Sequence, residues 1–204
     1  MTRTERLELV AVVLLATASI ATAWAAYQAR QWTGEQAHSY SVGTASRIAV
    51  NRATALASRQ VQIDVATFIQ WVDARAHGDA ALARFYRSRF RDEFRPAFAS
   101  WLATRPLEDP AAPETPFAMR QYRLAASTEA ERLEAAAGAA SDRAKDANEN
   151  AGSYMLAVVL FATALFFAGI STRLGTRALR LALLGIGCAV LIGTLLWTVT
   201  LPVA

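Results

Sequence analysis

Long uncharged stretches alternate with polar sequence along this chain of 204 residues. No charged residue occurs in residues 9–29, 150–172 or 181–204. As an α-helix rising about 1.5 Å per residue, each stretch is long enough to cross roughly 30 Å of hydrocarbon. The pattern predicts three transmembrane helices, with a polar, water-exposed segment between the first and the second.

The polar segment has the composition of helices. Residues 35–77 contain no proline and are rich in Ala, Gln, Arg and Leu, all of which favour helices. We expect this stretch to be one long helix, either separate from the first transmembrane helix or continuous with it. Gly78 and Asp79 then supply a helix stop and a new N-cap.

We therefore expect an all-α membrane protein, in which a long helical hairpin domain is inserted between the first and second of three transmembrane helices. Four prolines exclude regular structure from residues 104–116, and Glu114 or Thr115 is expected to start a second long helix that leads back to the membrane. The expected segments are, in chain order, an N-terminal segment with the first transmembrane helix (1–29), a helical extracytoplasmic domain (30–150), the second transmembrane helix (151–172), a cytoplasmic basic loop (173–180) and the third transmembrane helix (181–204). Within the extracytoplasmic domain we expect a long helix (35–77), short helices (79–103), a proline-rich loop (104–116) and a long helix (117–150).

The middle of the inserted domain carries an apolar stripe beside a basic one. Every fourth residue is apolar, which predicts one face of a second helix: Leu82, Tyr86, Phe90 and Phe94. Four arginines follow the neighbouring face: Arg84, Arg87, Arg91 and Arg95. Pro96 must kink or restart this helix. The arginines are candidates for binding an anionic envelope component, an acidic protein or an anionic ligand. Alternatively they are the solvated face of an amphipathic helix, in part paired with Asp92 and Glu93.

Positive charges set the expected orientation. The linker between the second and third apolar stretches contains Arg173, Arg177 and Arg180 but no acid. Short basic loops stay in the cytoplasm, and Arg3 and Arg6 put the N-terminus on the same side. We therefore expect residues 30–150 on the extracytoplasmic side of the membrane.

The first apolar stretch has a competing interpretation. Residues 21–23 form an A-x-A tripeptide, as at a signal-peptide cleavage site. Glu5 and Glu8 are unusual in the positively charged n-region of a signal peptide, and the apolar run is long for its h-region, so an uncleaved anchor is favoured. In both cases the inserted domain faces outward.

Small residues recur at a spacing of four in the transmembrane helices, where they let helix backbones approach closely. They are candidates for packing either within one bundle or between copies of the chain: Ala18, Thr22 and Ala26 in the first helix, and Gly185, Ala189 and Gly193 in the third. A two-helix stalk buries little surface alone, so we expect a homo-oligomer.

The sequence contains no recognised catalytic or cofactor motif. Glu35 and His38 share a helix face, and Asp73 and His77 stand four apart, but a metal site would need further ligands at matching spacing. Cys188 is the only cysteine, so an intrachain disulfide and a metal–thiolate cluster are excluded. We expect no enzymatic activity, no cofactor and no metal.

Two further features concern partners. The net charge of +4 is spread along the chain without a basic tail, so nucleic acid is not an expected partner. Asp64, between Ile63 and Val65, is expected to face solvent or to meet an arginine.

Five short motifs together resemble an uncharacterised family of bacterial inner-membrane proteins that are predicted to have three spans. These motifs are residues 24–29, 60–68, 94–98, 116–119 and 156–161. The resemblance covers nearly the whole chain and implies the topology and a bacterial envelope. It implies no activity and no functional residue.

Three functions are compatible with these features. The first is a non-enzymatic, oligomeric scaffold or interaction module of the envelope, whose outward helical head binds a protein or an anionic partner. The second is a sensory or regulatory membrane subunit, although only the first residues and the loop 173–180 could meet a cytoplasmic partner. The third is a small oligomeric pore, which the lack of ionisable groups within the apolar stretches disfavours.

Overall fold

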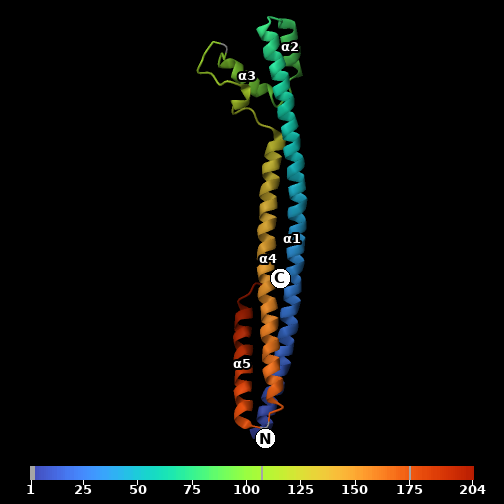
Figure 1. Cartoon of the computed structure of the whole chain (residues 1–204), viewed down its shortest axis with the longest axis vertical. Helices are drawn as coiled ribbons and strands as arrows, with labels where there is room; N and C mark the ends of the chain where they lie inside the picture. The colour runs from blue at the N-terminus through green and yellow to red at the C-terminus, as the bar shows by residue number, and fades with distance from the viewer. Residues whose placement is uncertain (1–2, 107, 175) are drawn as a thin grey trace. The chain divides into compact units, whose positions relative to one another are not determined.

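The computed structural model describes residues 3–106, 108–174 and 176–204, and side chains from residue 7 onward. Its elements are α1 (Arg3–Ala76), α2 (Ala80–Arg89), α3 (Arg95–Ala103), the 3₁₀ turn η1 (Pro116–Ala118), α4 (Ala125–Ser171) and α5 (Arg177–Val199), as Figure 1 shows. The described residues form helices and no strand, so the all-α prediction is confirmed. Three helices, α1, α4 and α5, are long and apolar enough to span a membrane.

The chain divides into two compact units. The terminal unit comprises residues 1–42 and 139–204, and the inserted unit comprises residues 43–138. Both α1 and α4 contribute residues to each unit. Residue 175 of the expected basic loop and the side chains of Arg3 and Arg6 lie outside the described residues.

α1 is a single helix that includes both the first apolar stretch and the expected helix 35–77. No proline occurs within it, so every interior residue can donate its backbone hydrogen bond. The helix stops where Gly78 adopts a positive φ of 75°, a conformation that glycine reaches without steric cost. The Asp79 carboxylate then accepts hydrogen bonds from the amides of Ala81 and Leu82, at 3.1 and 2.9 Å, and caps α2.

The expectation of one helix through Phe94 is wrong. α2 ends at Arg89, because Phe90 is extended, with φ −60° and ψ 137°. The turn after it brings both Phe90 and Phe94 into the core, where they are 2% and 0% exposed. Pro96 then restarts the chain as α3, in the first helical turn, where a missing amide hydrogen costs nothing.

α4 begins at Ala125, later than the expected start at residue 117. Thr115 makes no side-chain capping bond, and only the short turn η1 forms there. The ring of Phe117 is stacked on Phe94 with centroids 5.2 Å apart, which holds this segment in the core instead of in a helix. A distant side chain caps α4, since the amide of Ala125 donates to Glu93 Oε1 at 3.0 Å.

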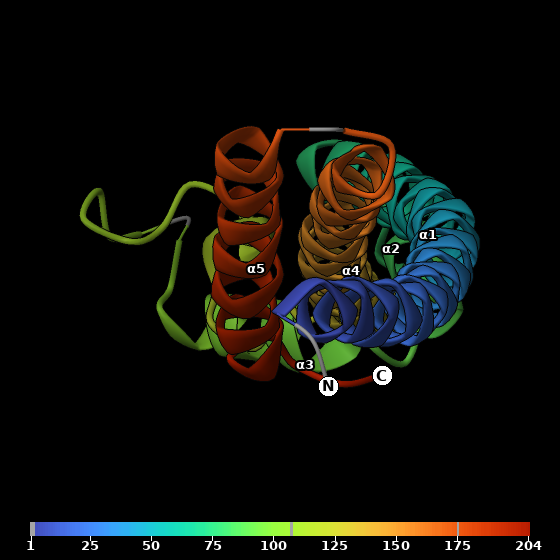
Figure 2. The same cartoon turned by 90° about the horizontal axis from the view of Figure 1, so that it is seen from below.

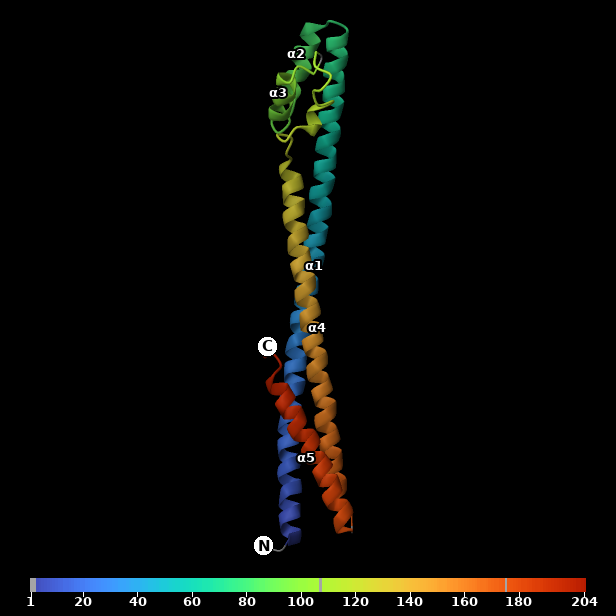
Figure 3. The same cartoon turned by 90° about the vertical axis from the view of Figure 1, so that its left-hand side faces the viewer.

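Alanine dominates the buried faces of the terminal unit. The buried apolar residues recur at spacings of three, four or seven, which keeps one stripe of each helix turned to its neighbours. They are Ala11, Leu14, Ala18, Ala21, Ala25 and Ala29 on α1, and Ala140, Ala144, Ala147, Tyr154, Ala157, Phe161, Ala164 and Ala168 on α4. Figures 2 and 3 show α1, α4 and α5 of this unit beside one another. Side chains this small let helix backbones approach closely.

At Gly187, α5 packs closely against α4. A Cβ atom added to Gly187 would lie 3.4 Å from the carbonyl oxygen of Ala164 and 3.5 Å from Cβ of Phe167. The buried residues of α5 are Leu184, Gly187, Leu191 and Thr194. This buried stripe is offset from the predicted one.

The predicted small-residue stripes are therefore only in part buried. Ala18 is fully buried, and Thr22 is half-buried with its hydroxyl donating to the Ala18 carbonyl at 2.7 Å. The other four, Ala26, Gly185, Ala189 and Gly193, are exposed within a single chain. The three on α5 remain candidates for packing between copies, and that packing stays a prediction.

An aromatic core holds the inserted unit together. Its buried members come from the last part of α1, from the turn after α2 and from α3: Phe68, Trp71, Phe90, Phe94, Phe98 and Trp101. Phe94 is central, with ring centroids of Phe90 and Phe117 at 5.0 and 5.2 Å. Most of the ring pairs are edge-to-face, the arrangement that ring quadrupoles favour.

Candidate functional site

A buried carboxylate organises the polar side chains of the inserted unit. Asp64 on α1 is 0% exposed. Its Oδ2 accepts a hydrogen bond from Arg91 Nη1 at 2.9 Å and another from the Tyr122 hydroxyl at 3.1 Å. Arg91 also pairs with Glu93, the residue that caps α4. The node therefore ties α1, the α2–α3 turn and the start of α4 together.

Burial controls the protonation of this node. Removal from water raises the pKa of Asp64, although the hydrogen bond from Tyr122 and the charge of Arg91 oppose the rise. Burial and the neighbouring Asp64 charge likewise raise the pKa of Tyr122, so its hydroxyl remains a donor. The second oxygen of Asp64, Oδ1, is buried without a partner among the described residues, which adds to the cost of ionising this carboxyl.

The structure divides the four predicted arginines into two pairs with different surroundings. The Arg91 side chain is only 21% exposed and belongs to the Asp64 node. Arg95 pairs with Asp92 at 2.8 Å, and its Nε donates to the Phe90 carbonyl at 3.0 Å. Arg91 and Arg95 therefore have ion-pair partners, whereas Arg84 and Arg87 are exposed and have no such partner among the described residues.

Arg84 and Arg87 meet a third arginine that sequence patterns did not single out. Together with Arg75 of α1 they line a cavity of about 370 Å³, here called the basic pocket, whose other walls are Trp71, Ala80, Ala83 and Leu102. No acidic side chain among the described residues lines it. None of its three arginines has an ion-pair partner among the described residues.

Two of these arginines are held by local contacts. Nε of Arg84 donates to the carbonyl of Ala80 at 3.2 Å. The guanidinium carbon of Arg87 lies 5.8 Å from the centroid of the Phe98 ring, within the range of a cation–π contact. Both contacts position the side chains without neutralising their charge.

Trp71 also lines a second cavity, here called the aromatic cavity. It has a volume of about 540 Å³, and Phe68, Trp71, Val72 and Trp101 provide most of its apolar wall. The proline loop closes it with Pro106, Pro110 and Pro113. Nε1 of Trp101 donates to the carbonyl oxygen of Pro113 at 2.7 Å, which fixes the loop against the ring.

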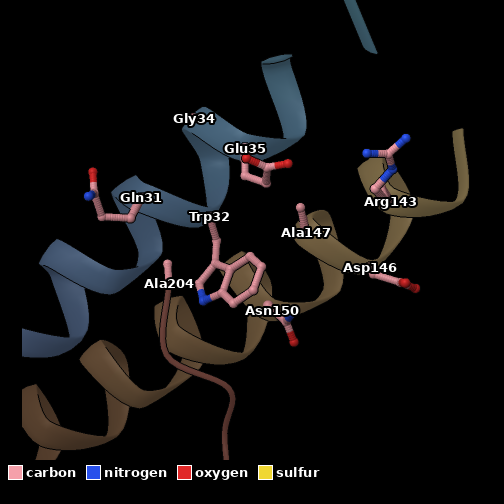
Figure 4. Close-up of a pocket in the computed structure, with 9 residues that line it drawn as sticks. All are labelled: Gln31, Trp32, Gly34, Glu35, Arg143, Asp146, Ala147, Asn150 and Ala204. Atoms are coloured by element: carbon pink, nitrogen blue, oxygen red, sulfur yellow. The ribbon is translucent and has the colours of Figure 1, made fainter. Parts of the chain in front are cut away.

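The terminal unit has a cavity of its own, of about 760 Å³, between α1 and α4. Figure 4 shows the indole of Trp32 between the two helices, beside Ala204. Carboxylates of both helices, Glu35 and Asp146, line it together with one guanidinium, Arg143. This mixed lining gives no preference for one sign of charge, unlike the basic pocket.

Pro202 and Ala204, which follow α5, form hydrogen bonds to side chains of α1 and α4 near this cavity. The indole N–H of Trp32 and the hydroxyl of Tyr154 each donate to the Pro202 carbonyl at 3.2 Å. The amide of Ala204 donates to Oε1 of the buried Gln28 at 3.1 Å. The segment after α5 is thus bound to both α1 and α4.

Other polar pairs noted in the sequence have ordinary surroundings. Glu35 and His38 are exposed, and Oε1 of Glu35 accepts a hydrogen bond from Ser39 at 3.3 Å. His77 Nδ1 lies 3.4 Å from Asp73 Oδ1, on an exposed helix end. No group of three or more potential metal ligands gathers among the described residues.

Comparison with known proteins adds nothing to these contacts. No family model, curated protein or solved structure matches the chain. A functional assignment must therefore come from the charge, shape and burial of its own residues.

Proposed function

We propose that this chain is a non-enzymatic, multi-pass protein of the bacterial inner membrane, and that its inserted unit lies outside the cytoplasm and binds an anionic partner at the basic pocket. In this topology the hairpin domain leaves the membrane with α1 and returns with α4. The observation that carries the proposal is the convergence of Arg75, Arg84 and Arg87 on one cavity without an acid among its described lining.

Electrostatics favours an anion in this pocket. Three guanidinium groups around one cavity repel each other, and a bound carboxylate or phosphate relieves that repulsion while accepting several charge-assisted hydrogen bonds. Guanidinium groups do not lose their proton, so the pocket stays cationic throughout the physiological pH range. Trp71 and Leu102 add an apolar wall that lowers the local dielectric constant and strengthens the attraction.

Contacts at both ends of the terminal unit support the proposed topology. Glu8, at the start of the first apolar stretch, lies 3.7 Å from Arg180, which precedes the third. The opposite ends of the three stretches meet through Pro202, Trp32 and Tyr154. Three spans with aligned ends put the N-terminal residues and the loop 173–180 on one side of the bilayer, and their arginines make that side the cytoplasmic one.

The proposal can be tested by photocrosslinking in cells. A photoreactive phenylalanine analogue replaces Phe85, which is 49% exposed and next to Arg84 but does not line the basic pocket. We expect adducts with an anionic partner, and we expect Arg84→Gln with Arg87→Gln to abolish them. A second probe at Arg177 samples the expected cytoplasmic side.

The matched control is Arg120→Gln with Arg123→Gln. It removes the same charge from two exposed positions of the inserted unit that do not line the pocket. Adducts that persist in the pocket variant, or that disappear equally in both variants, would contradict the proposed site. Adducts found at Arg177 alone would instead support a relay to a cytoplasmic partner.

A further inference from the structure

The basic pocket and the aromatic cavity share part of their walls. Trp71 and Arg75, one helical turn apart on α1, line both of them. Two consecutive residues of α3 line different cavities: Trp101 lines the aromatic cavity, and Leu102 lines the basic pocket. One ligand that lies across Trp71 can therefore occupy both spaces and contact Arg75 throughout.

The aromatic cavity is suited to an apolar group of limited size. Its volume of about 540 Å³ falls within the range of small-molecule sites, roughly 300 to 1,000 Å³. The indole N–H of Trp101 is already bonded to Pro113, so the ring presents carbon to the cavity. A phosphate or another small ion alone would leave this apolar wall in contact with water.

Charge gives such a ligand a fixed direction. Two acids, Asp109 and Glu114, and one arginine, Arg75, line the aromatic cavity, whereas three arginines and no described acid line the basic pocket. An anionic group is repelled from the first space and attracted to the second. A wholly apolar ligand would gain nothing from the arginines, and a cation would be repelled by them.

On the basis of the proposed anion site, we propose that the inserted unit binds a small anionic amphiphile. Its carboxylate or phosphate lies in the basic pocket among Arg75, Arg84 and Arg87, and its apolar chain or ring lies in the aromatic cavity against Trp71 and Trp101. The proline loop is then the part of the inserted unit that recognises the apolar moiety.

Calorimetric titration of the full chain tests this assignment. The protein is placed in detergent-free lipid nanodiscs, because a detergent is itself an amphiphile, and empty nanodiscs serve as the blank. The probes are 2-naphthyl phosphate, inorganic phosphate and a naphthylmethyl ammonium ion. We expect naphthyl phosphate to bind at least about tenfold more tightly than phosphate, since the ring buries apolar surface, and we expect no binding of the cation.

Two sets of variants separate the two halves of the site. Val72→Trp, at a position 42% exposed, and Ala112→Trp fill the aromatic cavity from α1 and from the proline loop, and neither position lines the basic pocket. Each should remove the advantage of naphthyl phosphate and leave phosphate binding unchanged. Arg84→Gln with Arg87→Gln should weaken both anions, while Arg120→Gln with Arg123→Gln should weaken neither. Circular dichroism confirms that each variant is folded.

The outcomes distinguish this inference from the proposed function. Equal affinity for phosphate and naphthyl phosphate, unchanged in the cavity-filling variants, would overturn the amphiphile and leave the anion site standing. Naphthyl phosphate binding that is insensitive to the Arg84 and Arg87 substitutions would overturn both. A failure of naphthyl phosphate to bind at all would also overturn the amphiphile.

Discussion

The helices of the two units pack through different kinds of side chain, mainly alanine in the terminal unit and aromatic residues in the inserted unit. In the terminal unit, small alanine side chains bring the helices into close contact. In the inserted unit, aromatic rings form the core, and Tyr122, which packs against them, donates to the buried carboxylate of Asp64. The buried carboxylate of this chain therefore lies in the unit whose core is aromatic.

The buried polar groups show the same difference. The buried polar side chains of the terminal unit, Gln28, Ser39, Ser171 and Thr194, are all uncharged. Asp64 of the inserted unit is the one buried charged side chain among the described residues. Arg91 is held by its ion pair with Asp64 and is only 21% exposed. The other three arginines of the predicted stripe, Arg84, Arg87 and Arg95, are exposed.

The largest expected effect comes from opening the aromatic core. Phe94→Ala removes a ring that is 0% exposed and contacts rings of α1, α3 and η1, which should lower the free energy of unfolding by about 3–5 kcal/mol. Leu82→Ala, at a position 40% exposed, is the control and should cost less than about 1 kcal/mol. Near-ultraviolet circular dichroism during chemical unfolding measures both. Equal losses would mean that the rings do not hold the inserted unit together.

Breaking the buried ion pair should be the next most costly change. Arg91→Ala leaves Asp64 buried without its cationic partner, and we expect a loss of about 2–3 kcal/mol, because the carboxyl can relieve part of the cost by taking up a proton. Arg95→Ala changes the same residue type in an exposed pair, and its loss should be about 1 kcal/mol or less. The same unfolding experiment measures both variants. A larger loss for Arg95→Ala would contradict the division of the arginine stripe.

Two glycines of α5 probe packing in the terminal unit. Gly187→Leu must push α4 and α5 apart and should cost about 1–3 kcal/mol, whereas Gly187→Ala fits in ordinary contact. Gly185→Leu meets no atom within 4 Å in a single chain and should leave stability unchanged. Thermal unfolding in nanodiscs compares the three.

The Gly185 variant also tests self-association. A homo-oligomer built on the exposed face of Gly185, Ala189 and Gly193 predicts that Gly185→Leu shifts the mass of the assembly toward the monomer. Light scattering of the detergent-solubilised protein measures that mass. A monomeric wild-type chain would remove the predicted oligomer altogether.

The smallest effect concerns pH and should appear in the inserted unit alone. The pKa of Asp64 is raised above its ordinary value of 3.8, so the folded state holds this proton more tightly than the unfolded state. The resulting stabilisation is complete below about pH 3.8 and is lost as pH rises through the raised pKa. Asp64→Asn lacks this loss, so its stability relative to the wild type should increase with pH above 3.8. Unfolding midpoints of both chains across pH 3 to 8 measure the difference, and a constant difference would rule out a raised pKa.

Sequence patterns predicted the parts of the fold that depend on local properties. Uncharged length predicted the three apolar helices, and Gly78 with Asp79 predicted the end of α1 and the cap of α2. The break at Phe90 and the start of α4 at Ala125 were missed. Both depend on aromatic contacts between residues far apart in the sequence, which helical periodicity does not record.

The candidate site was predicted only in part for the same reason. The spacing of arginines drew attention to Arg84 and Arg87, but it included Arg91 and Arg95, whose partners only the folded chain reveals. Arg75 was missed, because it belongs to another helix and meets the stripe only after the turn at Gly78. A helix stop followed by a basic helix was the one local signal that could have suggested it.

Hydrogen exchange measured by mass spectrometry, with and without 2-naphthyl phosphate, tests most directly the claim that the inserted unit is the binding unit. We expect slower exchange for amides near Trp71, Arg75 and Arg84, and unchanged exchange around the terminal-unit cavity at Trp32 and Arg143. Protection at Trp32 and Arg143 without protection at Arg75 and Arg84 would contradict this claim.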